Sequence, residues 1–265
     1  MATAVTVTTP GILNLNGVSQ QIGSLTGNGD VGLGSATLTV GDGNSTLLTG
    51  NIKDTANAGA SGSTSVGGKV TKVGSGTLTF AGTNVFTGLL TLSAGGIIVN
   101  SAAVLSANNA PLTVNGGTLT LNNVAQTIST LSGSGGTIVL GPGHTLTSDP
   151  IASSTFSGTI SGSVGLTRLN VLSGGTARTL TLSGPNSYDG NTIFNGGIVS
   201  VGSATALGST AGYTEVAAAR KSYLRVRPRP SIAPNPSESP ALEAPMPVPS
   251  QSSPAPIPSS ADRSH

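Results

Sequence analysis

The feature that most constrains this 265-residue sequence is that parts of it recur at a nearly constant spacing. The segment GTLTFAGTNVFTG at 76–88 returns 102 residues later as RTLTLSGPNSYDG at 178–190. A second segment, LNLNGVSQQIGSLTGNG at 13–29, returns after 106 residues as LTLNNVAQTISTLSGSG at 119–135, with nine of seventeen positions identical. Two pairs sharing nearly one offset predict a composite unit of about 100 residues that occurs twice, at about 12–111 and 112–212.

Both units consist of short runs in which β-branched and apolar residues alternate. Such alternation predicts strands with one buried and one solvated face. No stretch up to residue 212 shows a helical period. The runs are Thr37–Val40, Thr77–Phe80, Thr118–Leu121, Thr145–Thr147 and Thr179–Leu182.

Stacked coils explain this composition better than hairpins do. The chain has 39 Gly but only four Phe, three Tyr and no Trp, so a thick globular core would bury little area per residue. A propeller or meandering sandwich is the alternative, yet length-matched hairpin pairs around tight turns are missing. We therefore expect an all-β parallel solenoid of roughly nine coils, about 45 Å long at 4.8 Å per coil.

The composition changes abruptly near residue 213. Glycine stops at Gly212, and eleven of the sixteen prolines lie between Pro228 and Pro258. Residues 1–212 are therefore expected to form the β-helix, and 213–265 a disordered tail rich in Pro, Ser and Ala. The tail would be too poor in apolar residues to offset the entropy lost on ordering.

The charges do not indicate a nucleic-acid partner. Six of the eleven Lys and Arg residues lie beyond Glu215, and the other five are scattered, so no phosphate-binding cluster forms. The absence of Cys excludes disulfides and thiolate sites. The N-terminus lacks a signal-peptide pattern, and no segment has the apolar length of a transmembrane helix.

Residues 72–100 and 178–201 resemble the autotransporter-associated β-strand repeat, whose signature runs Gly-Thr-Leu-Thr-Leu, small-Gly, x-Asn-x-aromatic-x-Gly. Lys72, Gly74 and Gly95 also fit the first copy, and Gly196 and Gly197 the second, whereas Arg178 replaces the usual glycine. The matching signature residues are Gly76, Thr77, Leu78, Gly82, Asn84, Phe86 and Gly88, then Thr179, Leu180, Gly184, Asn186, Tyr188 and Gly190.

The resemblance implies a right-handed β-helix that serves as the passenger of a type V secreted autotransporter, displayed at the cell surface or released outside a Gram-negative bacterium. It implies a structural or adhesin-like role, with weak repetitive contacts to host or surface glycans or proteins. Neither the family's leader nor its translocator barrel is expected within this sequence, so export is expected to depend on a leader upstream. The repeat pattern breaks after Gly208. An interrupted reading frame, leaving a truncated, non-functional remnant, and a Pro-rich linker are both open explanations.

The sequence contains no recognisable catalytic motif, so we expect no enzyme activity, no cofactor and no metal. A carbohydrate-active β-helix enzyme, which would need two converging carboxylates, is the alternative. Of the possible pairs, only Asp30 and Asp54 are spaced to meet on adjacent coils. We call the expected β-helix, residues 1–212, the body of the chain. Its candidate carboxylates are Asp30, Asp42, Asp54, Asp149 and Asp189.

Four further patterns are interpreted as structural. His144 lies in a Gly-Pro turn, where a surface residue is expected. The stretch 27–32 fits a dinucleotide fingerprint formally, but no helix is predicted after it. Calcium-binding β-rolls need Asp every nine residues, and residue 39 is Thr. Asn84 and Asn186 are interpreted as satisfying turn backbone rather than as a binding ladder.

Overall fold

A computed structural model describes the chain over residues 3–55, 67–100, 105–106, 109–122, 125–162, 168–171, 178–216 and 223–226. Every regular element in these ranges is a β-strand. All pairings between the named strands are parallel, joining each coil to the next. The predicted solenoid of about nine turns is thereby confirmed, and the hairpin architectures do not fit the described residues.

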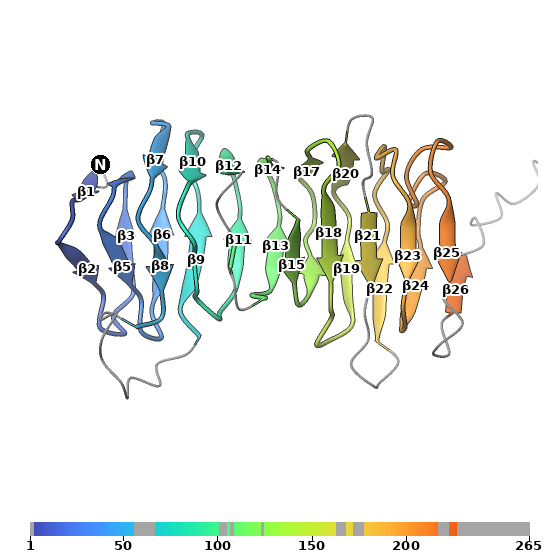
Figure 1. The fold of residues 1–265 in the computed structure, drawn as a ribbon, viewed down its shortest axis with the longest axis horizontal. Helices are drawn as coiled ribbons and strands as arrows, with labels where there is room; N and C mark the ends of the chain where they lie inside the picture. Colours follow the sequence, from blue (N-terminus) through green and yellow to red (C-terminus); the bar gives the residue numbers. More distant parts are fainter. Residues whose placement is uncertain are drawn as a thin grey trace, which may run out of the picture. The chain divides into compact units, whose positions relative to one another are not determined.

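The first face of the solenoid is a sheet to which each of the first eight coils contributes one strand. Figure 1 shows the coils of the body following one another in chain order. In the middle of the sheet Thr77 is paired with Gly96, and Gly96 with Thr118. Its eight strands are β1 (Val5–Val7), β4 (Leu25–Gly27), β7 (Thr46–Leu48), β10 (Thr77–Phe80), β12 (Gly96–Val99), β14 (Thr118–Leu121), β17 (Thr137–Leu140) and β20 (Thr159–Gly162).

The second face begins as a three-stranded sheet and resumes as a five-stranded one. An isolated parallel bridge from Lys53 to Val85 continues the face past its third strand. The strands are β2 (Ile12–Asn14), β5 (Asp30–Gly32) and β8 (Ile52–Lys53), then β15 (Gln126–Ile128), β18 (Thr145–Ser148), β21 (Arg168–Val171), β23 (Thr192–Phe194) and β25 (Thr214–Val216).

The third face consists of a six-stranded and a four-stranded sheet. A parallel bridge from Gly133 to Phe156 joins the two. The strands are β3 (Gln20–Ile22), β6 (Thr37–Val40), β9 (Lys69–Lys72), β11 (Leu90–Leu92), β13 (Leu112–Val114) and β16 (Leu131–Ser132), then β19 (Ser154–Phe156), β22 (Thr179–Leu182), β24 (Ile198–Val201) and β26 (Tyr223–Val226).

The core is a set of apolar columns, because alternate residues of each strand point inward and strands stack in register. On the third face Leu38, Val70, Leu90, Leu112 and Leu131 follow one another, each at most 1% exposed. Each such side chain contributes roughly 1.5–3 kcal/mol by burial. A thin column of aliphatic side chains can therefore replace the aromatic core that the composition lacks.

Glycine at one corner lets successive coils come into close contact. A Cβ atom on Gly50 would lie 1.9 Å from the carbonyl oxygen of Gly29, and one on Gly82 would lie 2.3 Å from that of Gly50. Real Cβ atoms do not approach oxygen so closely, so this corner requires glycine in these coils. The glycine abundance thus follows from the coil-to-coil spacing.

The coils continue past residue 212, where the composition changes. Strand β25 is paired with β23, and β26 with β24. The compact unit extends to Arg227. A strand depends on the alternation of apolar and polar residues and not on glycine. Strands can therefore continue after the glycine-rich sequence has ended. The expected disorder of the tail concerns residues that, from 227 onward, lie outside the described ranges.

Candidate functional site

The first copy of the repeat signature forms one 19-residue coil, from Thr77 in β10 to its partner Gly96 in β12. After β10 the chain bends inward, and Asn84 and Phe86 are both fully buried. The Asn84 Oδ1 atom accepts the backbone N–H of Ile52, on the preceding coil, at 2.9 Å. The asparagine thus satisfies backbone where only the isolated Lys53–Val85 bridge continues the second face.

The second copy repeats this coil with the same length, from Thr179 in β22 to Ile198 in β24. Asn186 is 3% exposed, and its Oδ1 accepts the N–H of Ile160 at 2.7 Å. Its Nδ2 donates to the carbonyl of Ala206 at 2.5 Å, on the following coil. One buried amide therefore connects three successive coils.

The aromatic residue of each copy fills the coil behind the asparagine. Phe86 packs in the core, whereas Tyr188 places its hydroxyl 2.6 Å from the Thr192 Oγ1 atom. Burial raises the pKa of Tyr188 to about 12, and the bond to Thr192 opposes that rise. The phenol is therefore neutral at physiological pH.

The glycines of the signature lie where coils approach most closely. A Cβ on Gly184 would lie 2.0 Å from the Gly158 oxygen, and one on Gly88 would lie 2.5 Å from the oxygens of Gly67 and Gly68. The Arg178 that replaces the usual glycine donates to the Pro150 carbonyl at 2.6 Å. All these contacts join the repeat to its neighbours, and none is catalytic in kind.

Asp30 and Asp54 do lie on adjacent coils of the second face. Asp30 corresponds in register to Asn51, so Asp54 lies three residues further on, about 10 Å along the strand direction. The Asp30 Oδ2 atom is 2.5 Å from the Lys53 Nζ. Burial raises the pKa of Asp30, but hydrogen bonds from Lys53 and Asn51 outweigh it and hold the pKa below its ordinary value.

Asp54 is buried and stabilises the chain around it. Its Oδ1 accepts the N–H of Gly68, and its Oδ2 accepts the N–H and hydroxyl of Thr87 at 3.1 and 2.6 Å. Three donors offset the cost of burying a carboxylate. Both acids of the pair are therefore engaged in structural contacts.

The other three carboxylates lie at separate places in the fold. Asp42 accepts the backbone N–H and the amide of Asn44 within a turn. Asp189 accepts the Ser209 hydroxyl at 2.7 Å on the next coil. Asp149 follows β18 and is half-buried. Within the described residues no group of three or more His, Cys, Asp or Glu is placed to hold a metal ion.

His144 and the formal dinucleotide pattern occupy structural positions. His144 donates its backbone N–H to the carbonyl of Gly141 in a turn before β18. Residues 27–32 end β4 and form β5, with no helix between them. Thr39, at the position where a calcium-binding β-roll would need Asp, lies within β6.

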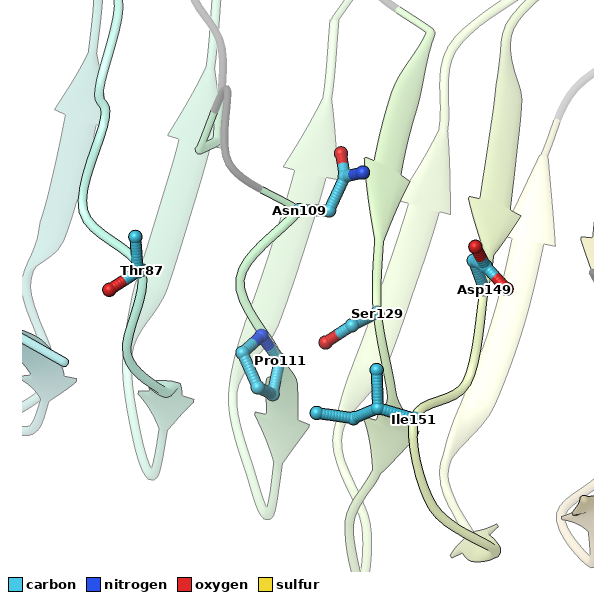
Figure 2. Close-up of a pocket in the computed structure, with 6 residues that line it drawn as sticks. All are labelled: Thr87, Asn109, Pro111, Ser129, Asp149 and Ile151. Carbon is cyan, nitrogen blue, oxygen red and sulfur yellow. The ribbon is translucent and has the colours of Figure 1, made fainter. Parts of the chain in front are cut away.

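A groove of about 280 Å³ crosses four coils at the corner between the second and third faces. Leu90 is in register with Leu112, and Leu112 with Leu131, so the groove runs across the strands. Figure 2 shows its residues on neighbouring chain segments. The groove is lined by Thr87, Asn109, Pro111, Ser129, Asp149 and Ile151.

The groove exists because corner lengths differ between coils. Two residues separate Ile128 of β15 from Leu131 of β16, whereas five separate Ser148 of β18 from Ser154 of β19. The longer corner forms one wall, with Ile151 63% exposed. No motif in the sequence marks this site, and its one signal is the extra length of the corner around Pro150.

In the part of the chain that the structure describes, no helix has the length and apolarity needed to cross a bilayer. Among known protein families, the passenger-associated-transport-repeat model matches residues 70–99 and 177–201. Each range contains one of the two 19-residue coils. No curated protein and no solved structure matched the chain. The chain is therefore a parallel β-solenoid in which two segments are similar to the passenger-associated-transport-repeat, a repeat of autotransporter passengers.

Proposed function

We propose that the body is a rigid, adhesin-like segment of an autotransporter passenger, which acts outside the cell by contact rather than by catalysis. The observation that carries this proposal is a column of hydroxyl groups on the third face. Successive coils place Thr39, Thr71, Thr91, Thr113 and Ser132 in register. All five are half-buried, and the Thr113 Oγ1 atom is 2.7 Å from the Ser132 Oγ.

Such a column supports weak repetitive contacts. Its members recur at about 4.8 Å, the spacing of adjacent strands. Each hydroxyl both donates and accepts a hydrogen bond. Several weak bonds presented together bind a polyvalent surface more tightly than any one does. Coil-on-coil stacking holds the spacing, because each coil is paired on both sides.

No observation favours the enzyme alternative. Asp149 is the only carboxylate of the described residues that lines the groove. Asp54 contacts Thr87 at the far end, and lies four coils before Asp149, about 19 Å away at 4.8 Å per coil. Glycoside hydrolysis needs carboxyl groups about 5–9.5 Å apart.

Surface display is the first test. Antibodies raised against the body should label intact cells of the source organism as strongly as permeabilised cells, with a periplasmic protein as the negative control. Labelling that requires permeabilisation would contradict the proposal.

Adhesion is the second part of the same test. Beads coated with the full chain should bind host or bacterial surfaces, and the triple variant Thr71→Val, Thr91→Val, Thr113→Val should bind several-fold less because three hydroxyls are lost at nearly constant shape. Thr79→Val with Thr120→Val, on the first face, is the matched control. Equal adhesion by both variants would contradict a role for the column.

A further inference from the structure

We propose that the groove at Thr87, Asn109, Pro111, Ser129, Asp149 and Ile151 is a binding site for a neutral oligosaccharide. The proposal rests on the adhesin-like function and assigns it one discrete site in addition to the hydroxyl column. The groove volume, about 280 Å³, is near the lower end of ligand sites in proteins.

The floor of the groove holds a hydroxyl that nothing in the fold uses. Ser129 is 7% exposed, and its Oγ has no hydrogen-bond partner. Leaving a buried hydroxyl unpaired costs about 1–3 kcal/mol. A rotation about χ1 can turn this oxygen toward a ligand without breaking any bond. Figure 2 shows Ser129 between Pro111 and Ile151, at the centre of the groove.

The backbone of the groove is already committed. The N–H of Ser129 donates to Asn109, that of Asp149 to Ile128, and that of Asn109 to Ser106. The N–H of Thr87 donates to Asp54 and that of Ile151 to the Thr130 hydroxyl, while Pro111 has none. A peptide therefore cannot add as a strand here, and an anion finds no backbone donors. Recognition must come from side chains.

Those side chains fit sugar hydroxyls. Ser129 and Asn109 can each donate and accept, and Asp149 accepts. The Thr87 hydroxyl already donates to Asp54 and accepts the Gly67 N–H, so it offers a ligand only one acceptor lone pair. Pro111 and Ile151 offer aliphatic surface to the C–H groups of a sugar ring. The lining contains one carboxylate and no Lys, Arg or His, so an acidic glycan would meet repulsion. The shared chemistry points to an uncharged chain of polyhydroxylated rings.

Binding to the full chain is measured by calorimetry with maltohexaose, cellohexaose and chitohexaose. Hexagalacturonate and decalysine serve as anionic and cationic probes. At least one neutral sugar should bind with a Kd on the order of 1 mM, as an open groove without aromatic stacking allows. The two charged probes should bind more weakly.

Variants then separate binding from folding. Ser129→Ala should weaken binding about 3–10-fold while leaving stability equal or higher, because it removes an unpaired hydroxyl. Ser154→Ala is the matched control, since Ser154 Oγ is also buried and unpaired but lies outside the lining. Asn109→Gly should weaken binding similarly and tolerate the φ of 53° at that position.

Three outcomes would overturn the inference: no binding of any neutral sugar, binding unchanged in Ser129→Ala and Asn109→Gly, or a charged probe that binds more tightly than the sugars. Asp149→Asn should leave sugar binding within about 3-fold but would abolish binding of a cation. If sugars fail while the threonine variants still reduce adhesion, the groove inference falls and the proposed function stands.

Discussion

The two repeat copies form the same coil on different faces of the solenoid. Strand β10 of the first copy belongs to the first face, whereas β22 of the second copy belongs to the third. The other recurring segments shift in the same way, because β2 is on the second face and β14 on the first. The chain advances four coils and two faces between copies. The motif therefore specifies a local coil, and its neighbours decide what each position contacts.

This difference explains where the copies diverge. The position held by Gly76 in the first copy is held by Arg178 in the second. Gly76 faces the backbone of Asn44 on the preceding coil, whereas Arg178 faces the longer corner 150–153. The buried pair Phe86 and Leu90 becomes Tyr188 and Thr192. In both copies a serine hydroxyl still accepts the first threonine N–H of the strand.

The largest effect is expected from exchanging the residues at the position that differs. A Cβ on Gly76 would lie 2.0 Å from the Asn44 carbonyl oxygen, so Gly76→Arg should destabilise the body by about 3 kcal/mol or more. Arg178→Gly should cost about 1–2 kcal/mol, for one lost hydrogen bond and added backbone entropy. Denaturant unfolding followed by circular dichroism measures both.

Gly43→Arg is the control for that exchange. Gly43 lies in an exposed turn, and the nearest atom to an added Cβ is the Ser75 Oγ at 3.7 Å. This variant should change stability by less than about 1 kcal/mol. If Gly76→Arg were equally mild, the two copies would not differ in their packing against the preceding coil.

A smaller effect is expected at the asparagines. Asn84→Ala leaves the Ile52 N–H unpaired, and Asn186→Ala leaves the Ile160 N–H and the Ala206 carbonyl unpaired. Each should lower the free energy of unfolding by about 2 kcal/mol. Asn115→Ala, which removes an exposed bond to Ser134 on the next coil, should cost under 1 kcal/mol. A mild Asn84→Ala would refute the shared role of the motif.

The smallest expected effect is a coupling within the second copy. Thr192→Leu alone leaves the buried Tyr188 hydroxyl without its 2.6 Å partner, and should cost about 1–3 kcal/mol. Tyr188→Phe should cost about 1 kcal/mol. The double variant recreates the Phe86–Leu90 pair, so its cost should fall short of the sum by about 1 kcal/mol. Additive costs would show that the hydroxyl pair is not a unit.

Much of the fold was predictable because its signals are local. Alternation in Thr77–Phe80 and Thr179–Leu182 predicted strands with inward-facing Leu78 and Leu180, which are buried. Low aromatic content predicted stacked coils, and the pairings are parallel. The boundary at residue 212 was predicted from the change in composition, and the strands β25 and β26 lie beyond it.

The groove could not be predicted, because its lining residues belong to four coils and are separated by up to 64 positions. Asp149 and Ser129 are ordinary residues in the sequence. They become neighbours only after two corners of unequal length are stacked, and no sequence pattern relates one corner to the next.

The sequence by itself determined the strand pattern and the recurring asparagine–aromatic segment, because each depends on residues close together in the chain. Only the tertiary structure decided which face each copy occupies, which residue opposes Gly76 or Arg178, and where the groove opens. The physical reason is that the face on which a segment lies depends on the summed lengths of all preceding coils. A few extra residues in one corner therefore change the face on which every later segment falls.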